Sequence, residues 1–504
     1  MRYWPAGASA VTVLLVGLWR IGSPQLWRDE VSSWSAASRS LGDLFAMLGN
    51  VDASNGAYYL LLHGWTALAG DSPTALRLPS AIAMAGTAWF TAMTAQWLFH
   101  SRVAGLAAGM LLAVAPSVSR YAQEARSYAL VACAVTAALW CLVRALDLSV
   151  DRSLDRSLDR APWRWWVGFT VCTALGGILH LVSLVAVVGQ LPLVLAAGRR
   201  VLKPYAASVA VAVLPVVPLV VLGTVQVGRQ LSWIDRPDSE DLQFFWQGLI
   251  GAHQVMYALL GLVALGLLLP GAAAGTRAVT ARLVLLAALP VLLVWLVSQG
   301  TTSYFADRYL LFTVPVWAIA AGGGVAAAHG AVRAADARHT ALSGAVATVL
   351  AVGLVAYPAY LAVPRERGVR GTTAHSPNDY SGAAELIARG YRSGDELIAA
   401  GGLEAWLMIG PALDYYLPEG VEPAQPYVAR SAEDADDLYP VESRVPAGGL
   451  RTAHRIWVVT NGTSGDPYQK LTAEQTSALR ADFTPAEVRR VAGLTVSLLV
   501  RNQQ

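Results

Sequence analysis

Long apolar runs recur along the chain, and they constrain its fold more than any other feature of the sequence. A run of about 20 apolar residues can cross a bilayer as a helix, and shorter runs can cross with tilted or snorkelling ends. With 55% hydrophobic and only 14% charged residues, the chain is predicted to be a polytopic α-helical membrane protein. About eleven transmembrane helices are expected, at 6–19, 78–99, 103–118, 128–146, 165–179, 181–197, 205–225, 256–269, 283–297, 309–328 and 341–363.

The basic residues of the short loops predict how the chain is oriented. If the N-terminus is cytoplasmic, each inside loop carries arginine or lysine, from Arg2 and Arg102 through to Arg333 and Arg338. An odd number of spans then places everything after Val363 outside. The predicted location is the cytoplasmic (inner or plasma) membrane, multi-pass, with the N-terminus inside.

Two domains are expected. Residues 1–363 form the transmembrane part, whose first outer loop, 21–77, contains two apolar stretches that are predicted to be interfacial or re-entrant helices. Residues 364–504 have the composition of a soluble domain, and alternating patterns predict a small extracytoplasmic α/β domain. Its helices are expected at 378–391, 404–417 and 473–483, its strands at 396–399 and 455–460, and one or two further strands at 488–501.

Adjacent carboxylates follow the first apolar run. Asp29 and Glu30 come directly after Arg28 in a stretch that Trp27 and Trp34 flank. Ionisable groups at a membrane boundary cost solvation energy unless they are paired or used, which favours a functional role. The alternative is an interfacial anchor, with aromatic rings at headgroup depth and charges in water. The stretch alone leaves both interpretations open.

Arginines gather in two other segments on the predicted outer face. Arg120 and Arg126 follow the third span, and Arg308 precedes the tenth. Arginine is suited to phosphate, so these side chains and Tyr121 are candidates for binding a phosphate group. The structural alternative is an ion pair between Arg120 and Glu124, with Arg126 snorkelling to the headgroups.

The sequence also bears on nucleic-acid binding, metal binding and acceptor contacts. The net charge of +3 comes almost entirely from arginine and gives no indication of nucleic-acid binding. The paired carboxylates could attract a divalent cation, although the sequence contains no dedicated metal-ligand set, so no metal ligand is assigned. The candidates for acceptor or loop contacts are Asp52, His63, His180 and Trp233.

Three motifs in order carry a resemblance to a known family. They are Leu-Trp-Arg-Asp-Glu at 26–30, Tyr-Ala-Gln-Glu-Ala-Arg-Ser-Tyr at 121–128 and Asp-Arg-Tyr-Leu at 307–310. Together they resemble the GT-C superfamily of membrane glycosyltransferases, in particular bacterial protein O-mannosyltransferases and lipid A aminoarabinose transferases. The segment 55–65 is also similar to a family segment, but Gly56 and Ala57 stand where the family usually has prolines.

This resemblance implies an inverting transferase that uses a polyprenyl-phosphate sugar, with mannose placed before arabinofuranose. The family's catalytic base maps onto Asp29, with Glu30 as its neighbour or a second candidate. The arginines would stabilise the leaving phosphate, and the acceptor would be an envelope glycan, lipid or protein. The alternatives are a lipid or polysaccharide transporter or flippase and a non-catalytic scaffold of envelope assembly. The sequence shows no inverted repeat of broken helices, which counts against transport.

Overall fold

The structure is a computed structural model that describes residues 3–150, 162–269, 274–335, 340–399, 402–443, 446, 450 and 453–502. The chain forms two compact units. The first contains residues 1–21, 52–58 and 77–369, and the second contains residues 22–51, 59–76 and 370–504. The loop segments 22–51 and 59–76 group with the C-terminal segment in the second unit. The division into domains 1–363 and 364–504 stays a prediction.

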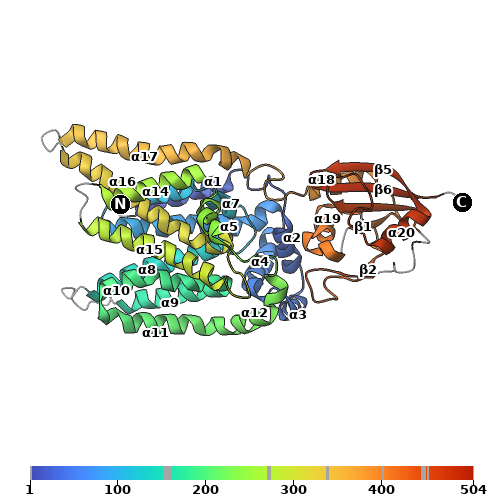
Figure 1. Ribbon diagram of the computed structural model, residues 1–504, viewed down its shortest axis with the longest axis horizontal. Coiled ribbons are helices and arrows are strands. Elements are labelled where there is room, and N and C mark those ends of the chain that lie inside the picture. Colours follow the sequence, from blue (N-terminus) through green and yellow to red (C-terminus); the bar gives the residue numbers. More distant parts are fainter. Residues whose placement is uncertain are drawn as a thin grey trace. The chain divides into compact units, whose positions relative to one another are not determined.

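The first unit is a helical bundle whose long helices run side by side (Figure 1). Two further helices, α4 (Gly56–Ala69) and α5 (Pro73–Leu98), continue from one unit into the other. The elements wholly within the first unit are α1 (Trp4–Leu18), η1 (Ala53–Asn55), α6 (Arg102–Val114), α7 (Pro116–Ala122), α8 (Tyr128–Val150), α9 (Pro162–Leu179), η3 (Leu181–Val185), α10 (Ala186–Ala197), η4 (Arg199–Val201), α11 (Leu202–Val213), η5 (Leu214–Val216), α12 (Val217–Gln230), α13 (Ser239–Ile250), α14 (His253–Leu268), α15 (Ala274–Val297), η6 (Asp307–Thr313), α16 (Val314–Ala335) and α17 (Thr340–Gly368).

Each expected apolar run is helical, so the predicted class of a mostly helical membrane protein is confirmed. Among the described residues, five helices are long and apolar enough to cross a membrane, or up to seven if each of two bent pairs counts as one span. The bent pairs are α6 with α7, at 69°, and α13 with α14, at 92°. The count of eleven spans stays a prediction.

A run of three glycines lets α16 pack at the centre of the first unit. A Cβ on Gly322 would lie 2.6 Å from the Ala104 carbonyl oxygen of α6, and one on Gly324 would lie 1.8 Å from the Leu262 carbonyl oxygen of α14. Small residues permit such close approach of helix backbones in membrane bundles. This packing fixes the helices that carry η6, which directly precedes α16.

The second unit combines the outer-loop helices with a small α/β fold. Its four-stranded sheet has the order β1-β4-β6-β5, in which β1 is parallel to β4 and the other pairs are antiparallel. The core of the sheet includes Ile398, Ile456 and Leu499. The elements are α2 (Arg28–Ala37), α3 (Leu41–Asn50), α18 (Tyr380–Gly390), β1 (Glu396–Ala399), η7 (Gly402–Leu407), α19 (Ile409–Tyr416), β2 (Val428–Arg430), β3 (Val441–Glu442), β4 (Arg455–Asn461), α20 (Ala473–Asp482), β5 (Phe483–Val491) and β6 (Leu494–Arg501).

The expected small C-terminal α/β fold is confirmed, with three local differences. The helix predicted at 404–417 is interrupted at Met408, whose φ of 56° is left-handed. The last region forms two strands, one of the two predicted alternatives, but the first strand begins at Phe483 and not at Val488. The pair β2 and β3 was not predicted, since strands of three and two residues are too short to show a pattern.

Candidate active site

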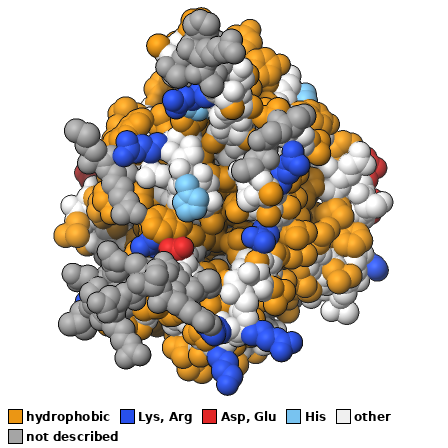
Figure 2. Space-filling view, turned by 90° about the vertical axis from the view of Figure 1, so that its left-hand side faces the viewer, with side chains coloured by type: hydrophobic (Ala, Val, Ile, Leu, Met, Phe, Trp, Pro, Cys, Tyr) orange, Lys and Arg blue, Asp and Glu red, His pale blue; other side chains and the backbone are white. Residues whose placement is uncertain are grey.

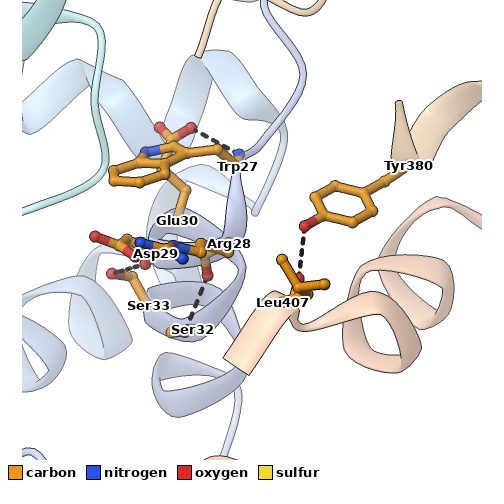
Figure 3. A network of polar contacts seen from close by, with 8 residues as sticks. All are labelled: Trp27, Arg28, Asp29, Glu30, Ser32, Ser33, Tyr380 and Leu407. Atoms are coloured by element: carbon orange, nitrogen blue, oxygen red, sulfur yellow. Dashed lines mark hydrogen bonds and ion pairs between the residues drawn. The ribbon is translucent and has the colours of Figure 1, made fainter. Parts of the chain in front are cut away.

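Asp29 lies in the first turn of α2, within the second unit (Figure 3). Its carboxylate oxygen Oδ1 is 3.4 Å from Nε of Arg28, and the two side chains are 19% and 30% exposed. The Ser33 hydroxyl donates to the backbone carbonyl of Asp29 at 3.0 Å and not to its carboxylate. A carboxylate at a helix N-terminus is also favoured by the helix dipole. Asp29 is thus an accessible, charge-paired carboxylate.

Glu30 has a different environment from its neighbour. Its side chain is fully buried, and its Oε2 accepts the backbone N–H of Trp27 at 3.4 Å (Figure 3). A glutamate at the third position of a helix commonly reaches back to the N-cap in this way. Glu30 therefore holds the start of α2, and Asp29 is the more accessible carboxylate of the pair.

The start of α2 is attached to the C-terminal segment by hydrogen bonds. The side-chain amide of Gln25 donates to the Asn378 carbonyl at 2.7 Å and accepts from the Ser381 N–H at 3.1 Å. The backbone N–H of Leu26 donates to the Tyr416 hydroxyl at 2.6 Å. Because Gln25 and Leu26 directly precede the helix, these bonds fix where Asp29 lies within the second unit.

Aromatic side chains surround the same helix. The guanidinium carbon of Arg28 is 4.6 Å from the Trp406 ring centroid, and Trp406 is 47% exposed. The Trp34 ring packs edge-on against Tyr415 at 5.0 Å, and its indole N–H donates to Asp71 at 3.0 Å. Arg28 therefore contacts both the exposed Trp406 indole and the Asp29 carboxylate.

A second group of candidate residues lies in the first unit, around four aromatic rings from α7, α8, η6 and the residue before η3. The Tyr128 ring lies 5.6 Å from Tyr121, 5.9 Å from His180 and 6.2 Å from Tyr309. His180 and Tyr309 are 4.5 Å apart. Since Arg120, Arg126 and Arg308 adjoin or nearly adjoin these rings in sequence, we call the three arginines and four rings the arginine cluster.

The predicted phosphate-binding residues are brought together in this cluster. Tyr121 is within electrostatic range of Arg120 and Arg308, and His180 is within range of Arg126 and Arg308. Arg120 forms the expected ion pair with Glu124, whose side chain is buried. Positive charge thus gathers around the four aromatic rings, which suits a phosphate anion.

The segment between Arg120 and Tyr128 is not a continuous helix, although Arg120 and Glu124 are four residues apart. The helix α7 ends at Ala122, and α8 begins at Tyr128. The turn is fixed by the Ser80 hydroxyl, which donates to the Glu124 carbonyl at 2.6 Å, and by the Gln123 amide, which donates to the Gly17 carbonyl at 2.8 Å. These tertiary bonds offset the lost helical bonds.

The four acceptor or loop candidates divide between the units. In the first unit, the Trp233 ring centroid is 4.6 Å from the Arg308 guanidinium carbon, and His180 is one of the clustered rings. Asp52 adopts a left-handed φ of 58° and accepts the Asn55 amide at 2.7 Å, which indicates a turn-forming role. In the second unit, Nδ1 of His63 is 2.9 Å from the Ala37 carbonyl oxygen, so it attaches α4 to the end of α2.

Asp29 and Glu30 are the carboxylates that the sequence suggested for a divalent cation. Among the residues the structure describes, no three His, Cys, Asp or Glu side chains lie together as a metal site. Glu30 caps its helix, so a divalent cation at Asp29 would take its other ligands from water or substrate.

Comparison with known proteins gives the fold a family. The sequence profile of the dolichyl-phosphate-mannose-protein mannosyltransferases matches residues 57–222. The apo crystal structure of ArnT from Cupriavidus metallidurans superposes with a TM-score of 0.60 and 15% identity, over 97% of this chain and 97% of that one. The chain therefore shares its fold with this GT-C transferase. The predicted resemblance is confirmed.

Two further solved transferases show the same fold. The oligosaccharyltransferase AglB from Archaeoglobus fulgidus, solved with an inhibitory peptide and a dolichol-phosphate, matches with a TM-score of 0.53 and 11% identity, over 91% of this chain and 69% of that one. The arabinofuranosyltransferase AftD from Mycobacteria matches with a TM-score of 0.54 and 16% identity, over 100% of this chain and 40% of that one. No curated protein sequence matches significantly.

Three residues beside the candidate groups of the two units had no role predicted from the sequence. Tyr128 and Tyr309 were quoted in motifs without a role, and Trp406 was not noticed. The signal for the tyrosines was their place beside Arg126 and Arg308. For Trp406, the signal was an aromatic side chain within an otherwise polar domain, which is weak because many such rings are core residues.

Proposed function

We propose that the chain is an inverting glycosyltransferase that moves a sugar from a polyprenyl-phosphate carrier to a glycan, lipid or protein acceptor. The reaction takes place on the outer face of the cytoplasmic membrane, with the N-terminus inside and the C-terminal domain outside. The observation that carries the proposal is the accessible carboxylate of Asp29 in the first turn of α2. The fold shared with ArnT supports transferase chemistry.

The chemistry assigns a separate task to each group of residues. Asp29 accepts the proton of the acceptor hydroxyl as its oxygen attacks the anomeric carbon. The bond from that carbon to the carrier phosphate breaks, and the phosphate leaves with the electron pair. The arginine cluster offers cations that would stabilise the charge on this phosphate. Attack opposite to the leaving group inverts the anomeric centre.

Two findings support a polyprenyl-phosphate donor. A further crystal structure of ArnT contains undecaprenyl phosphate and superposes with a TM-score of 0.57 and 15% identity, over 97% of each chain. The AglB structure contains dolichol-phosphate. We place mannose first because the matching profile is that of mannosyltransferases, and arabinofuranose second because AftD is an arabinofuranosyltransferase.

The test is transfer of radiolabelled sugar from a panel of polyprenyl-phosphate sugars, with membranes that contain wild type, Asp29→Asn or Asp43→Asn. Asp43 is a matched control because it also lies in the first turn of a helix, α3, in the same unit. We expect Asp29→Asn to lower turnover by about 100-fold to 10,000-fold and Asp43→Asn to leave it unchanged.

Equal transfer by wild type and Asp29→Asn would exclude this carboxylate as the base. No transfer from any donor by folded wild type would favour a transporter or scaffold. Repeating the assay with EDTA, and then with Mg²⁺ or Mn²⁺, shows whether a divalent cation contributes.

A further inference from the structure

A buried turn separates α7 from α8 in the first unit, and it carries two charged residues. The turn, 123–127, lies between the end of α7 at Ala122 and the start of α8 at Tyr128. Glu124 and Arg126 are 1% and 9% exposed, and the other residues of the turn are fully buried. Buried charges cost solvation energy unless they are paired or used, and irregular backbone among membrane helices is tolerated where protein encloses it and satisfies its polar groups. The burial of this turn therefore favours a functional role.

Many charged side chains of the first unit lie instead at its surface. Figure 2 shows one end of this unit, where arginine and lysine side chains lie at the surface among hydrophobic ones. Arg102, Arg199 and Arg200 are exposed cations of the same unit. Glu124 and Arg126 differ from them because they are enclosed by the bundle.

Ser80 of α5 holds the turn through its backbone. The Ser80 hydroxyl is fully buried, donates to the Glu124 carbonyl at 2.6 Å and lies 3.3 Å from the Arg126 carbonyl oxygen. The Arg126 N–H donates to the same Glu124 carbonyl at 2.9 Å. The backbone is therefore fixed on both sides of the Arg126 Cα, and one hydroxyl takes part in the contacts on each side.

Gln123 holds the other end of the turn. Its buried side-chain amide donates to the Gly17 carbonyl and to the Trp19 carbonyl, each at 2.8 Å. The helix α1 ends at Leu18, and carbonyls at the end of a helix lack partners within the helix. Gln123 thus attaches the turn to the end of α1, as Ser80 attaches it to α5. The shape of the turn is set by neighbouring helices and not by its own sequence alone.

The turn places Arg126 in the arginine cluster. Arg126 is within electrostatic range of His180, whose ring lies 4.5 Å from that of Tyr309. Recognition of a phosphate by arginine depends on the orientation of the guanidinium fork as well as on its charge. A displacement of about 1 Å can weaken such a site strongly. A shift of the turn would therefore impair phosphate binding without removing any charge.

We propose that Ser80 and Gln123 are positioning residues for Arg126, whose guanidinium they keep oriented for the donor phosphate. They act through the backbone of the turn and do not contact the substrate themselves. This inference rests on the proposed function, because it takes the arginine cluster as the site of the donor phosphate. Loss of either set of hydrogen bonds should weaken binding of the carrier phosphate and leave acceptor binding unchanged.

The test measures the Kd for polyprenyl phosphate, the KM for donor and for acceptor, kcat and Tm, with full-length protein in detergent. Ser80→Ala removes the hydroxyl, Ser80→Thr keeps it, and Gln123→Met removes both amide bonds. Thr91→Ala is the matched control. Thr91 is also fully buried on α5, but its hydroxyl donates to the Thr87 carbonyl of its own helix at 2.7 Å.

We expect Ser80→Ala and Gln123→Met to raise the Kd for polyprenyl phosphate and the KM for donor about tenfold, with acceptor KM and kcat unchanged. Ser80→Thr should recover most of the affinity. Thr91→Ala should match wild type in Kd and KM, while its Tm falls about as much as that of Ser80→Ala. If Ser80→Ala does not fold, Gln123→Met decides.

Two outcomes would overturn the positioning role alone. One is equal binding of polyprenyl phosphate by wild type and by folded Ser80→Ala and Gln123→Met. The other is an equal loss of affinity in Thr91→Ala, which would show a general loosening of the bundle. Wild type that neither binds polyprenyl phosphate nor transfers sugar would overturn the proposed function, and this inference with it.

Discussion

The guanidinium carbon of Arg28 lies 4.6 Å from the centroid of the Trp406 ring, while its Nε lies 3.4 Å from Oδ1 of Asp29. Arg28 thus connects the candidate base to an indole of the C-terminal segment. One side of that indole is covered by the guanidinium, and 47% of the residue stays exposed. An exposed tryptophan beside a candidate base is a suitable surface for an acceptor to pack on.

Trp406→Ala is therefore expected to weaken acceptor binding. We expect the KM for acceptor to rise about fivefold to 30-fold, because a lost aromatic packing surface costs about 1–2 kcal/mol. The KM for donor should stay the same, and Trp406→Phe should give an intermediate value. Initial rates at saturating donor measure this effect. A change in donor KM with acceptor KM unaltered would contradict the assignment.

Replacing Glu30 should change stability more than Asp29 replacements do. Glu30→Ala removes the acceptor of the Trp27 N–H and should lower the free energy of unfolding by about 1 kcal/mol or more. Glu30→Gln keeps an acceptor oxygen and should recover part of this loss, while Asp29→Asn should leave the Tm unchanged. Thermal unfolding in detergent provides the measurement. Loss of turnover in Glu30→Gln at an unchanged Tm would instead identify Glu30 as the base.

Arg308→Gln should weaken binding of the donor phosphate. Loss of a charged hydrogen-bond donor should raise the KM for the polyprenyl-phosphate sugar about tenfold to 100-fold, with acceptor KM unchanged. Arg308→Lys keeps the charge but loses the fork geometry, so an intermediate effect is expected. Arg236→Gln is the matched control, since Arg236 lies in the same unit but donates to Gln299 at 3.1 Å. If both glutamine variants behave alike, the arginine cluster is not the donor site.

Local patterns predicted the elements of this protein well, because hydrophobic runs and alternation are properties of short segments. The runs at 128–146 and 309–328 became α8 and the η6–α16 pair, and the segment 455–460 became β4. Asp29 and Glu30 lie in the first turn of α2, which is where acidic residues are favoured by the helix dipole.

The sequence did not predict the contacts between segments that are far apart along the chain. The outer-loop segment 22–51 packs with the C-terminal segment through bonds such as Gln25 to Asn378, which are 353 residues apart. The spacing of Arg120 and Glu124 predicted their ion pair. It did not predict that Glu124 lies in a turn, where its backbone carbonyl accepts a hydrogen bond from the Ser80 hydroxyl. No local pattern shows such partners, because each depends on how distant segments meet.

Tyr380 should make the second unit sensitive to alkaline pH. Its ring is buried, its hydroxyl donates to the Leu407 carbonyl at 2.5 Å (Figure 3), and burial raises the pKa of Tyr380 to about 12. The folded protein therefore favours the neutral phenol, so this contribution to stability is full below the unfolded pKa of about 10 and falls as pH rises through the folded value. The expected loss is roughly 1.4 kcal/mol per pH unit between about 10 and 12.

Tyr380→Phe isolates this effect. At pH 7 the variant should be less stable by about 1 kcal/mol, because the bond to Leu407 is lost. Phenylalanine does not ionise, so the difference should shrink and then reverse above pH 10. Denaturant unfolding of wild type and variant at pH 7, 9 and 11, with tyrosinate absorbance recorded in parallel, provides the comparison. A stability difference that stays constant from pH 7 to 11 would show that the Tyr380 hydroxyl titrates as an exposed phenol.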